Sequence, residues 1–341
     1  MRRLSFTLIA GLLGLLLVNG CQKDTGSALT DEQMEEQSIQ DLMTNENTEE
    51  SDYLADWGID DGSEDHMFNG YSTFSPGSFL PKVTDFIPDV VRFGRKLNRQ
   101  IPRTFITERI SEDTIIVHME RAWTGQFVIF QKLDSTAGSP DTMIIYRKPL
   151  THLVKRTSIL TKRIEDEEAM RDPRRRWKLA AVSLGLGESR PTNTVQIQQV
   201  EVNSSTGDFY SFTDPLHTIL SIPEDLPAFL PGEIVMVKVW VSNSTTLPVI
   251  NPADGSTETL LLHFGVNRMH RARKQFEYRG IDPNNGYHVF EGQWMVREPV
   301  RRPFHAVIDA IDNGTIYDDD GNTYPYNSTT WGIPYRVVLN K

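Results

Sequence analysis

Two residues in an apolar run near the end of the chain have the chemistry of an acid–base pair. In the run from Phe304 to Ile311, strand alternation would place His305 and Asp309 on the same face. An imidazole beside a carboxylate can move a proton or ligate a metal, whereas on an exposed face the two would form an ordinary hydrogen bond. The pair is therefore a candidate enzyme site, with a surface hydrogen-bonded pair as the alternative.

A second group of polar side chains follows closely. Asp318, Asp320 and Asn322 concentrate oxygen atoms of the kind that calcium binds. The segment lacks the twelve-residue spacing and the terminal glutamate of an EF-hand, so a polar hairpin tip is the alternative. Calcium is the one cofactor that the sequence indicates.

Five aromatic residues would form a platform for a glycan if they were exposed, and would otherwise pack in the core. They are Tyr287, Trp294, Tyr326, Trp331 and Tyr335.

The sequence motifs of the common enzyme classes are missing. The chain has no GxSxG, no P-loop, no GxGxxG after a strand and no HExxH, and its eight histidines are scattered. Its 341 residues predict about two domains, and 38% hydrophobic with 24% charged residues is ordinary globular composition. These features favour a non-catalytic soluble fold.

The single cysteine, Cys21, follows an apolar run from Leu4 to Val18 that Arg2 and Arg3 precede. As a helix the run would be about 22 Å long, too short for a hydrocarbon core of about 30 Å, and a basic start before a short apolar run is typical of a secretory signal. The sequence Leu17-Val18-Asn19-Gly20-Cys21 resembles the lipobox of bacterial lipoproteins, although Asn19 replaces the usual small residue. The resemblance implies a signal peptide over residues 1–20, cleavage before Cys21 and acyl chains on its thiol and new amino group.

The residues that follow Cys21 indicate in which membrane the protein would be anchored. Gln22 stands where an aspartate commonly retains such proteins in the inner membrane, so the resemblance implies an outer-membrane lipoprotein. Gln22-Lys23-Asp24 is similar to a lysine-plus-acid signal for the outer face, and both the surface-facing and the periplasm-facing orientation stay open. An ordinary signal peptide or an uncleaved anchor is the alternative to lipidation.

Residues 21–70 are strongly acidic. Residues 22–65 contain fifteen acids and one base, whereas the net charge of the whole chain is only −11. Low hydrophobicity with self-repelling charge predicts a disordered tether, in which a transient helix over residues 31–43 is the most that we expect. Because the rest of the chain is nearly neutral, we expect no nucleic-acid partner.

Residues 75–188 predict an α+β domain. The apolar spacing from Val83 to Leu97 favours a helix, and the runs that follow have strand character, with Gly125 at a hairpin position. This order of elements resembles the cone-shaped family typified by nuclear transport factor 2, whose cones often enclose a pocket. Such a pocket, or alternatively a solvated sheet face, would contain Arg109, His118, Arg121, Arg147 and His152. The expected strands are 104–110, 114–123, 126–132, 142–148, 153–164 and 177–184.

Residues 193–341 predict a β-sandwich with an immunoglobulin-like architecture, because short alternating runs are separated by turn dipeptides. In the run from Ile234 to Val241, the odd-numbered valines share one face, and Trp240 lies on the other, where we expect it to be exposed. The charged segment Met269 to Arg279 is expected to be a loop or a short helix. The expected strands are 194–202, 217–222, 234–241, 257–264, 287–296, 304–311 and 333–339.

The predicted fold class is therefore mainly β with α+β: an antiparallel sheet packed on one helix, followed by an immunoglobulin-like β-sandwich. The predicted function is a lipid-anchored component of the cell envelope that binds a protein or glycan partner, or has a structural role, without catalysis. The sandwich is the expected contact surface. The alternative is a hydrolytic or glycan-handling enzyme that uses the pocket of the first domain or the His305/Asp309 pair.

Overall fold

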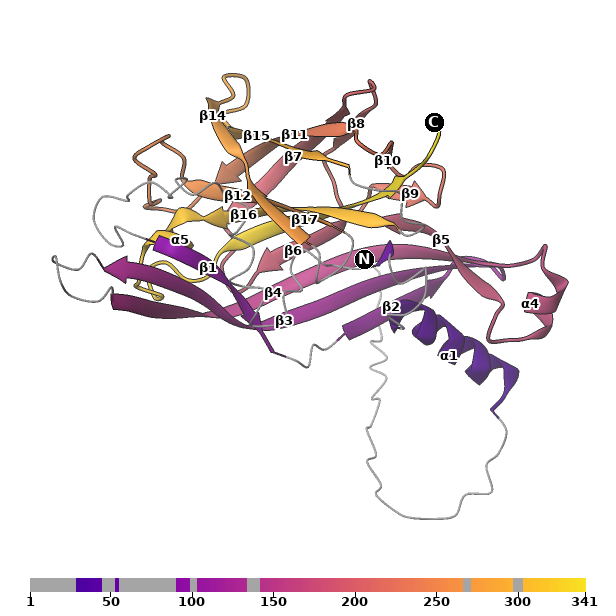
Figure 1. Cartoon of the computed structure of the whole chain (residues 1–341). Coiled ribbons are helices and arrows are strands. Elements are labelled where there is room, and N and C mark those ends of the chain that lie inside the picture. The colour runs from indigo at the N-terminus through magenta and orange to yellow at the C-terminus, as the bar shows by residue number, and fades with distance from the viewer. Residues whose placement is uncertain are drawn as a thin grey trace, which may run out of the picture.

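The chain is mainly β, with antiparallel, curled sheets and few helices (Figure 1). The computed structural model describes residues 29–44, 53–54, 90–98, 103–133, 142–265, 271–296 and 303–341. The larger sheet contains β1 (Val90–Leu97), β2 (Arg103–Arg109), β3 (Thr114–Leu133), β4 (Thr142–Lys162), β5 (Trp177–Ser183), β6 (Gly185–Ser189), β9 (Ile219–Ser221), β10 (Ala228–Phe229), β12 (Glu258–Gly265), β13 (Arg271–Gln275), β16 (Phe304–Asp312) and β17 (Ser328–Val337). The smaller sheet has the order β14 (Glu277–Ile281), β15 (His288–Met295), β11 (Ile234–Asn243), β7 (Val195–Ser204) and β8 (Phe209–Phe212).

Two long strands, β3 and β4, form the centre of one end of the larger sheet. They are 20 and 21 residues long and pair continuously from Thr114 opposite Thr161 to Leu133 opposite Thr142. The hairpin expected at Gly125 is therefore wrong, because β3 runs straight through this glycine. A Cβ atom at Gly125 would lie 2.1 Å from the backbone oxygen of Lys96, so the missing side chain lets β1 approach β3 closely.

The predicted helix over Val83 to Leu97 is wrong for residues 90–97, which form β1; residues 83–89 lie outside the described part. Phe93 and Leu97 are four residues apart, a spacing that fits one helix face and also one strand face. In the structure Phe93, Arg95 and Leu97 are all buried, and Lys96 is exposed. The burial pattern therefore has a period of two residues, as in a strand. The sequence did not indicate this period because one of the buried residues is an arginine.

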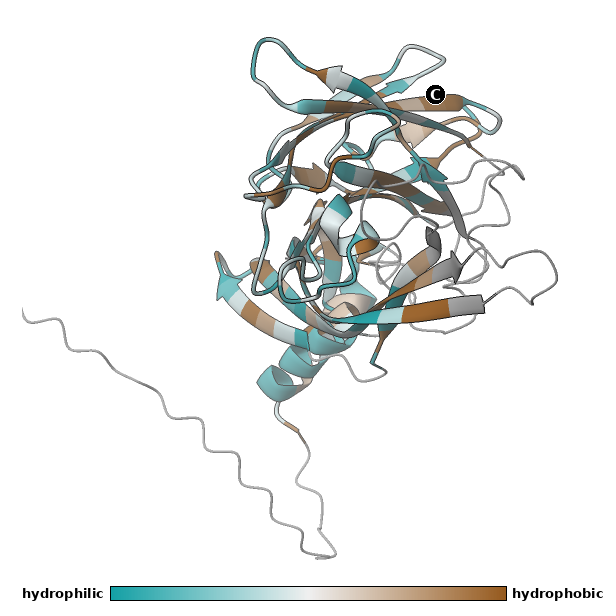
Figure 2. Ribbon diagram, turned by 90° about the vertical axis from the view of Figure 1, so that its left-hand side faces the viewer, coloured by the Kyte–Doolittle hydropathy of each residue, from teal (hydrophilic) through white to brown (hydrophobic). Residues whose placement is uncertain are grey.

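Residues 31–44, expected to be part of a disordered tether, form helix α1 (Asp31–Thr44). Thr30 and Gln33 make a reciprocal cap, in which the N–H of Gln33 donates to Thr30 Oγ1 at 3.3 Å and the N–H of Thr30 donates to Gln33 Oε1 at 3.0 Å. The helix is hydrophilic along most of its length, as Figure 2 shows, but Ile39 and Met43 are buried against strands of the larger sheet. The expectation of disorder is wrong for this segment, and most of the remaining residues from 21 to 70 lie outside the described part.

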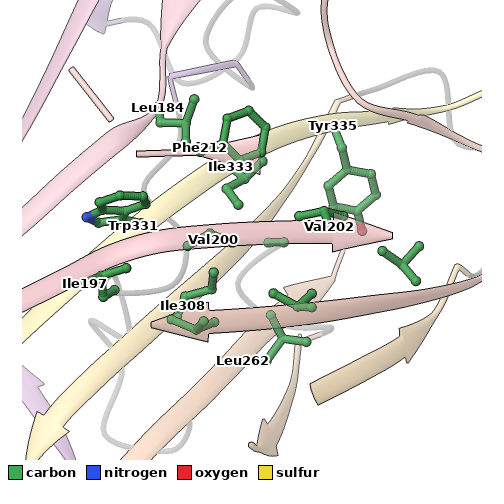
Figure 3. Close-up of a cluster of buried hydrophobic side chains, with 14 of the residues drawn as sticks. Leu184, Ile197, Val200, Val202, Phe212, Leu262, Ile308, Trp331, Ile333 and Tyr335 are labelled. Atoms are coloured by element: carbon green, nitrogen blue, oxygen red, sulfur yellow. The ribbon is translucent and has the colours of Figure 1, made fainter. Parts of the chain in front are cut away.

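The main core lies between the two sheets (Figure 3). Its side chains come from β7, β11 and β15 on one side and from β12, β16 and β17 on the other. The alternation predicted for β11 is confirmed, since Val235, Val237, Val239 and Val241 are all buried in this core. Trp240, expected to be exposed, is buried on the other face, where its Nε1 donates to Asp282 at 2.8 Å.

A second core lies on the opposite face of β16 and β17, inside the curl of the larger sheet. Phe93 and Leu97 of β1 and Phe127 of β3 share it with Ile311 and with residues of the short helix α5 (Asn313–Tyr317). Every residue of β16 is buried, because one face of the strand packs in each core. β6 pairs with β17, so the larger sheet includes strands from both of the ranges expected to be domains.

Two smaller regions complete the fold. The predicted loop or short helix over 269–279 is wrong for residues 271–275 and 277–279, which belong to β13 and β14. β13 is the last strand in the order of the larger sheet and β14 the first in that of the smaller sheet, and charged side chains suit such edge strands. A short helix, α4 (Glu167–Arg171), follows β4, and the side chain of Asp166 caps it by accepting from the N–H of Ala169 at 2.9 Å.

Candidate functional site

The structure places Asp309 in the second core, in a buried ion pair with Arg95. Arg95 Nη1 donates to Asp309 Oδ2 at 2.5 Å and Nη2 donates to Oδ1 at 2.8 Å, while Ser328 Oγ donates to Oδ1 at 2.8 Å. Burial alone would raise the pKa of Asp309, but the charge and hydrogen bonds of Arg95 hold it well below its usual range. Asp309 is therefore a fixed carboxylate that binds an arginine.

The same pair extends into a network of buried polar groups. Arg95 Nε donates to the Tyr326 hydroxyl at 2.7 Å, and this hydroxyl lies 3.0 Å from His152 Nδ1. Burial and the positive charge of Arg95 lower the pKa of His152 to about 3, so its ring is neutral at pH 7. We call Arg95, Asp309, Tyr326, Ser328 and His152 the buried network.

His305 lies on the same strand face as Asp309, as predicted, but both side chains are buried. The described partners of Asp309 are Arg95, Ser328 and the ring of His263, whose Nε2 lies 3.4 Å from Oδ2. The interpretation as a surface hydrogen-bonded pair is therefore wrong, while an acid–base or metal-binding role of the two residues stays a prediction. The physical reason is that β16 has a packed core on each face.

The five residues expected to line a pocket of the first domain are not brought together. Arg109 lines a cleft of about 680 Å³ under α1, whereas His118 lines a separate hollow of about 250 Å³. Arg147 is exposed, while Arg121 and His152 are buried. A single solvated sheet face is also wrong, because Arg109 and His118 lie on opposite faces of the sheet and two of the five residues are buried.

The calcium candidates lie together in the loop between α5 and β17. Asp318 Oδ1 accepts from the N–H of Asp320 at 2.8 Å, and Asp320 Oδ1 accepts from the N–H of Asn322 at 2.9 Å. The ammonium of Lys148 donates to the backbone oxygens of Gly314 and Tyr324 at 2.8 and 2.6 Å. No group of three His, Cys, Asp or Glu residues in the described ranges is arranged to hold a metal, and calcium stays a prediction.

The aromatic residues proposed as a glycan platform belong to the interior. Trp294, Trp331 and Tyr335 pack in the core between the sheets, and Tyr326 belongs to the buried network. Tyr287 alone among the five is partly exposed. An exposed platform made of these side chains is therefore ruled out.

The outer face of the smaller sheet carries large apolar side chains in contact with solvent. Phe209, Ile234, Met236 and Met295 are 58%, 41%, 50% and 55% exposed, and we call them the outer patch. Strand register groups them: Met236 pairs with Asn203, which pairs with Phe209, and Ile234 pairs with Met295. Contiguous exposed apolar residues with polar neighbours are typical of interaction surfaces.

A groove of about 380 Å³ adjoins the outer patch at Met236. Lys238 and Lys274 line it together with Arg279 and Glu291, which form an ion pair at 2.9 Å. The alternation in β11 places Met236 and Lys238 on this face. The patch as a whole was not predictable, because Phe209 and Met295 come from β8 and β15.

Acidic side chains lie close to Lys341 where this sheet approaches β10 and β17. The ammonium of Lys341 lies 2.8 Å from Thr206 Oγ1 and 3.0 and 3.1 Å from the two carboxylate oxygens of Glu233, and it also contacts Asp208 Oδ2. It lies 5.8 Å from the centroid of the Phe229 ring. We call Asp208, Glu233, Thr206 and Phe229 the lysine cradle.

Comparisons with known proteins do not identify a family. No protein-family profile matches the chain, and no curated protein matches it in sequence. Among solved structures, it is similar to the SMP and C2 domains of extended synaptotagmin 2, at 8% identity over 71% of this chain and 89% of that chain. The TM-score is 0.15, and a likeness at that level carries no argument about fold or function. Among the described residues, no helix is long and apolar enough to cross a bilayer.

Proposed function

We propose that this protein is a lipid-anchored component of the bacterial outer membrane that binds a protein partner without catalysing a reaction. The lipobox-like sequence that ends at Cys21 supports the anchor, and Cys21 is the only cysteine of the chain. It lies outside the described residues. Because burial of acyl chains is worth about 0.8 kcal/mol per CH₂, two or more chains hold a protein on a bilayer.

The outer patch is the observation that carries the binding role. We propose that the smaller sheet and the β12, β16 and β17 part of the larger sheet form an immunoglobulin-like sandwich whose outer face contacts the partner. Four large apolar side chains on one face of the smaller sheet, beside a groove with cationic and anionic side chains, fit a protein interface better than they fit open solvent.

An enzymatic role has less support. The titratable groups that come together in the buried network are enclosed by packed side chains, and Asp309 already binds an arginine. Catalytic groups need a concave site that a substrate can enter. The packing around the buried network therefore favours binding over the alternative of a hydrolytic or glycan-handling enzyme at the His305/Asp309 pair.

Replacement of Cys21 tests the anchor. In the native bacterium, Cys21→Ser should abolish incorporation of a labelled fatty acid and release the protein from the membrane fraction, whereas wild type keeps both properties. Protease added to intact cells then distinguishes a surface-facing from a periplasm-facing orientation. Sedimentation of Cys21→Ser with the envelope at the wild-type level would contradict lipid anchoring.

Site-specific photocrosslinking tests the contact surface. A photoreactive residue at Met236 or Met295 should give a discrete adduct in intact cells, because these side chains lie in the outer patch. The matched control is Ile250, which is exposed to a similar extent in a loop away from the patch. Adducts of equal yield at Ile250 and Met236, or none at either patch position, would refute the proposed surface.

A further inference from the structure

We infer that β2 is a second docking site, at which an extended segment of a protein partner adds an antiparallel strand to the larger sheet. The occupant to which we commit is a segment in which apolar residues alternate with long polar residues such as glutamine. The site lies on the larger sheet, away from the four residues of the outer patch, so this inference goes beyond the proposed function and stands on other observations.

One side of β2 presents main-chain groups that no strand pairs. In the described ranges β2 pairs with β3 alone, at the border of the larger sheet (Figure 1). The N–H of Ile110 donates to the oxygen of Thr114 at 3.0 Å, and β2 continues from there in regular register. Main-chain groups of a strand alternate in direction, so those of Phe105, Thr107 and Arg109 point away from β3. We call them the β2 edge, and within the described part of the chain no residue bonds to them.

A hollow adjoins β2 on each face of the sheet. Phe105, Thr107 and Arg109 line the cleft of about 680 Å³ under α1. Thr104 and Ile106 line the separate hollow of about 250 Å³. Successive side chains of a strand point to opposite faces, so an added strand would direct alternate side chains toward the two hollows. In strand addition, main-chain pairing gives affinity and pockets for alternate side chains give specificity.

The two hollows accept different side chains. Ile106 is 68% exposed and Leu216 lines the same hollow, so an apolar side chain placed there would remove apolar surface from water. In the cleft under α1, Arg109 and Lys162 lie on the sheet, and the helix contributes acids, Glu32 among them. A glutamine amide has both donors and an acceptor, so it complements walls of opposite charge.

The length and regularity of β2 suit strand addition. Sheet edges that stay unpaired are commonly very short or interrupted by proline or a bulge. β2 spans seven residues, against about 5–6 for an average strand, and contains neither a proline nor a shift in register. Its charged residues Arg103, Glu108 and Arg109 discourage pairing with an arbitrary strand, so the site selects a segment that complements them.

Peptide binding to the detergent-solubilised full chain tests the inference. The probe is an end-labelled heptapeptide in which glutamine and leucine alternate, and fluorescence anisotropy measures its binding. Glutamines that point toward the cleft lie opposite the β2 edge, so their N–H groups face β2. N-methylation of the glutamines removes these donors, whereas N-methylation of the leucines removes N–H groups that point away. The first peptide should bind at least about ten-fold more weakly than the second, because several main-chain hydrogen bonds are lost.

Two variants at one position test the protein side of the contact. Thr107→Pro removes an N–H that points away from β3, so it blocks the added strand and keeps the hydrogen bonds between β2 and β3. Thr107→Val keeps this N–H and is the matched control. Thr107→Pro should abolish binding of the unmodified peptide and Thr107→Val should retain it, with the same circular dichroism for both. The comparison of the two N-methylated peptides uses wild type, so it decides the question even if Thr107→Pro does not fold.

Three results would overturn the inference. The first is equal binding of the two N-methylated peptides, or no binding of the unmodified one. The second is a loss of binding with Met236→Ser that equals the loss with Thr107→Pro, since the peptide would then lie on the outer patch. The third is dimerisation of wild type that Thr107→Pro abolishes, which would assign the β2 edge to a second copy of this chain.

The crosslinking experiment keeps this inference separate from the proposed function. Peptide binding that depends on the β2 edge, without any adduct at Met236 or Met295 in cells, means that the β2 edge is a docking site while the outer patch is not the contact surface. A Met236 adduct together with equal binding of the two N-methylated peptides means the reverse.

Discussion

Replacement of Arg95 by methionine should destabilise the protein more than any loss of a surface charge. The guanidinium makes two hydrogen bonds to Asp309, one to Tyr326 and one to Ser328, all in the second core. Without it, Asp309 is a buried carboxylate whose positive partner is gone. Breaking a buried pair by removal of one partner costs about 3–5 kcal/mol. This is a large fraction of the roughly 5–15 kcal/mol that stabilises an ordinary domain.

The assay is urea unfolding at pH 7, followed by tryptophan fluorescence. Arg175→Met serves as the control, since Arg175 pairs with Glu168 at an exposed position and should show no measurable change. The double variant Arg95→Met/Asp309→Leu should recover about 2 kcal/mol or more, because it removes the stranded charge. If Arg95→Met lowers the free energy of unfolding by less than about 1 kcal/mol, or if the double variant is less stable than the single one, the explanation by an unpaired buried carboxylate is refuted.

The ion pair between Arg95 and Asp309 should also make the stability of the protein depend on pH. Arg95 keeps the pKa of Asp309 well below the ordinary value of 3.8. Its contribution is therefore fully present above pH 3.8 and is lost as the pH falls through the lower folded value. The difference in stability between wild type and Arg95→Met should shrink below about pH 4. A difference that stays constant from pH 7 to pH 2 would contradict the assignment of an ion pair.

Three further perturbations have defined outcomes. The hydrogen bond that His288 Nδ1 donates to Glu258 Oε1 at 2.5 Å raises the pKa of His288 above 6.5. Its contribution to stability is therefore complete below pH 6.5 and is lost as the pH rises through the folded value. Urea titrations from pH 5.5 to 9 should show this loss for wild type and a flatter profile for His288→Gln. Gly125→Ala should destabilise by about 1–3 kcal/mol, because the new Cβ would meet the backbone of Lys96, and an unchanged urea midpoint would refute that contact. If Asp318 and Asp320 hold calcium, the melting temperature should be several degrees higher in calcium than in chelator, and equal temperatures would exclude the site.

Sequence reasoning succeeded where local pattern and tertiary environment agree. β11 alternates valines with larger or polar residues, and the structure buries those valines as predicted. It failed for β1, where Arg95 interrupts the apolar pattern of a buried strand face. The partner that makes this burial tolerable, Asp309, is 214 residues away, so no local window contains the reason for it. α1 was expected only as a transient helix for a related cause. Its acidic sequence is unfavourable alone, but Arg109 of β2 and Arg176, next to β5, pair with Glu35.

The candidate sites show the same limit. His305 and Asp309 share a strand face, as alternation requires, but alternation does not reveal whether that face meets solvent or a second core. The outer patch and the lysine cradle depend on strand register between β7, β8, β11 and β15. Register is set by side chains distant in sequence, so neither surface could be assembled from one segment.

The docking of α1 has a geometric consequence for a chain anchored through Cys21. A freely extended stretch from residue 22 to residue 70 would reach as far as about 170 Å from the bilayer. With residues 31–44 attached to the larger sheet, only residues 22–30 would connect Cys21 to the folded part, and nine residues span at most about 32 Å. Anchored in this way, the folded part of the protein would stay next to the membrane surface. Any partner that it binds would therefore also lie close to that membrane.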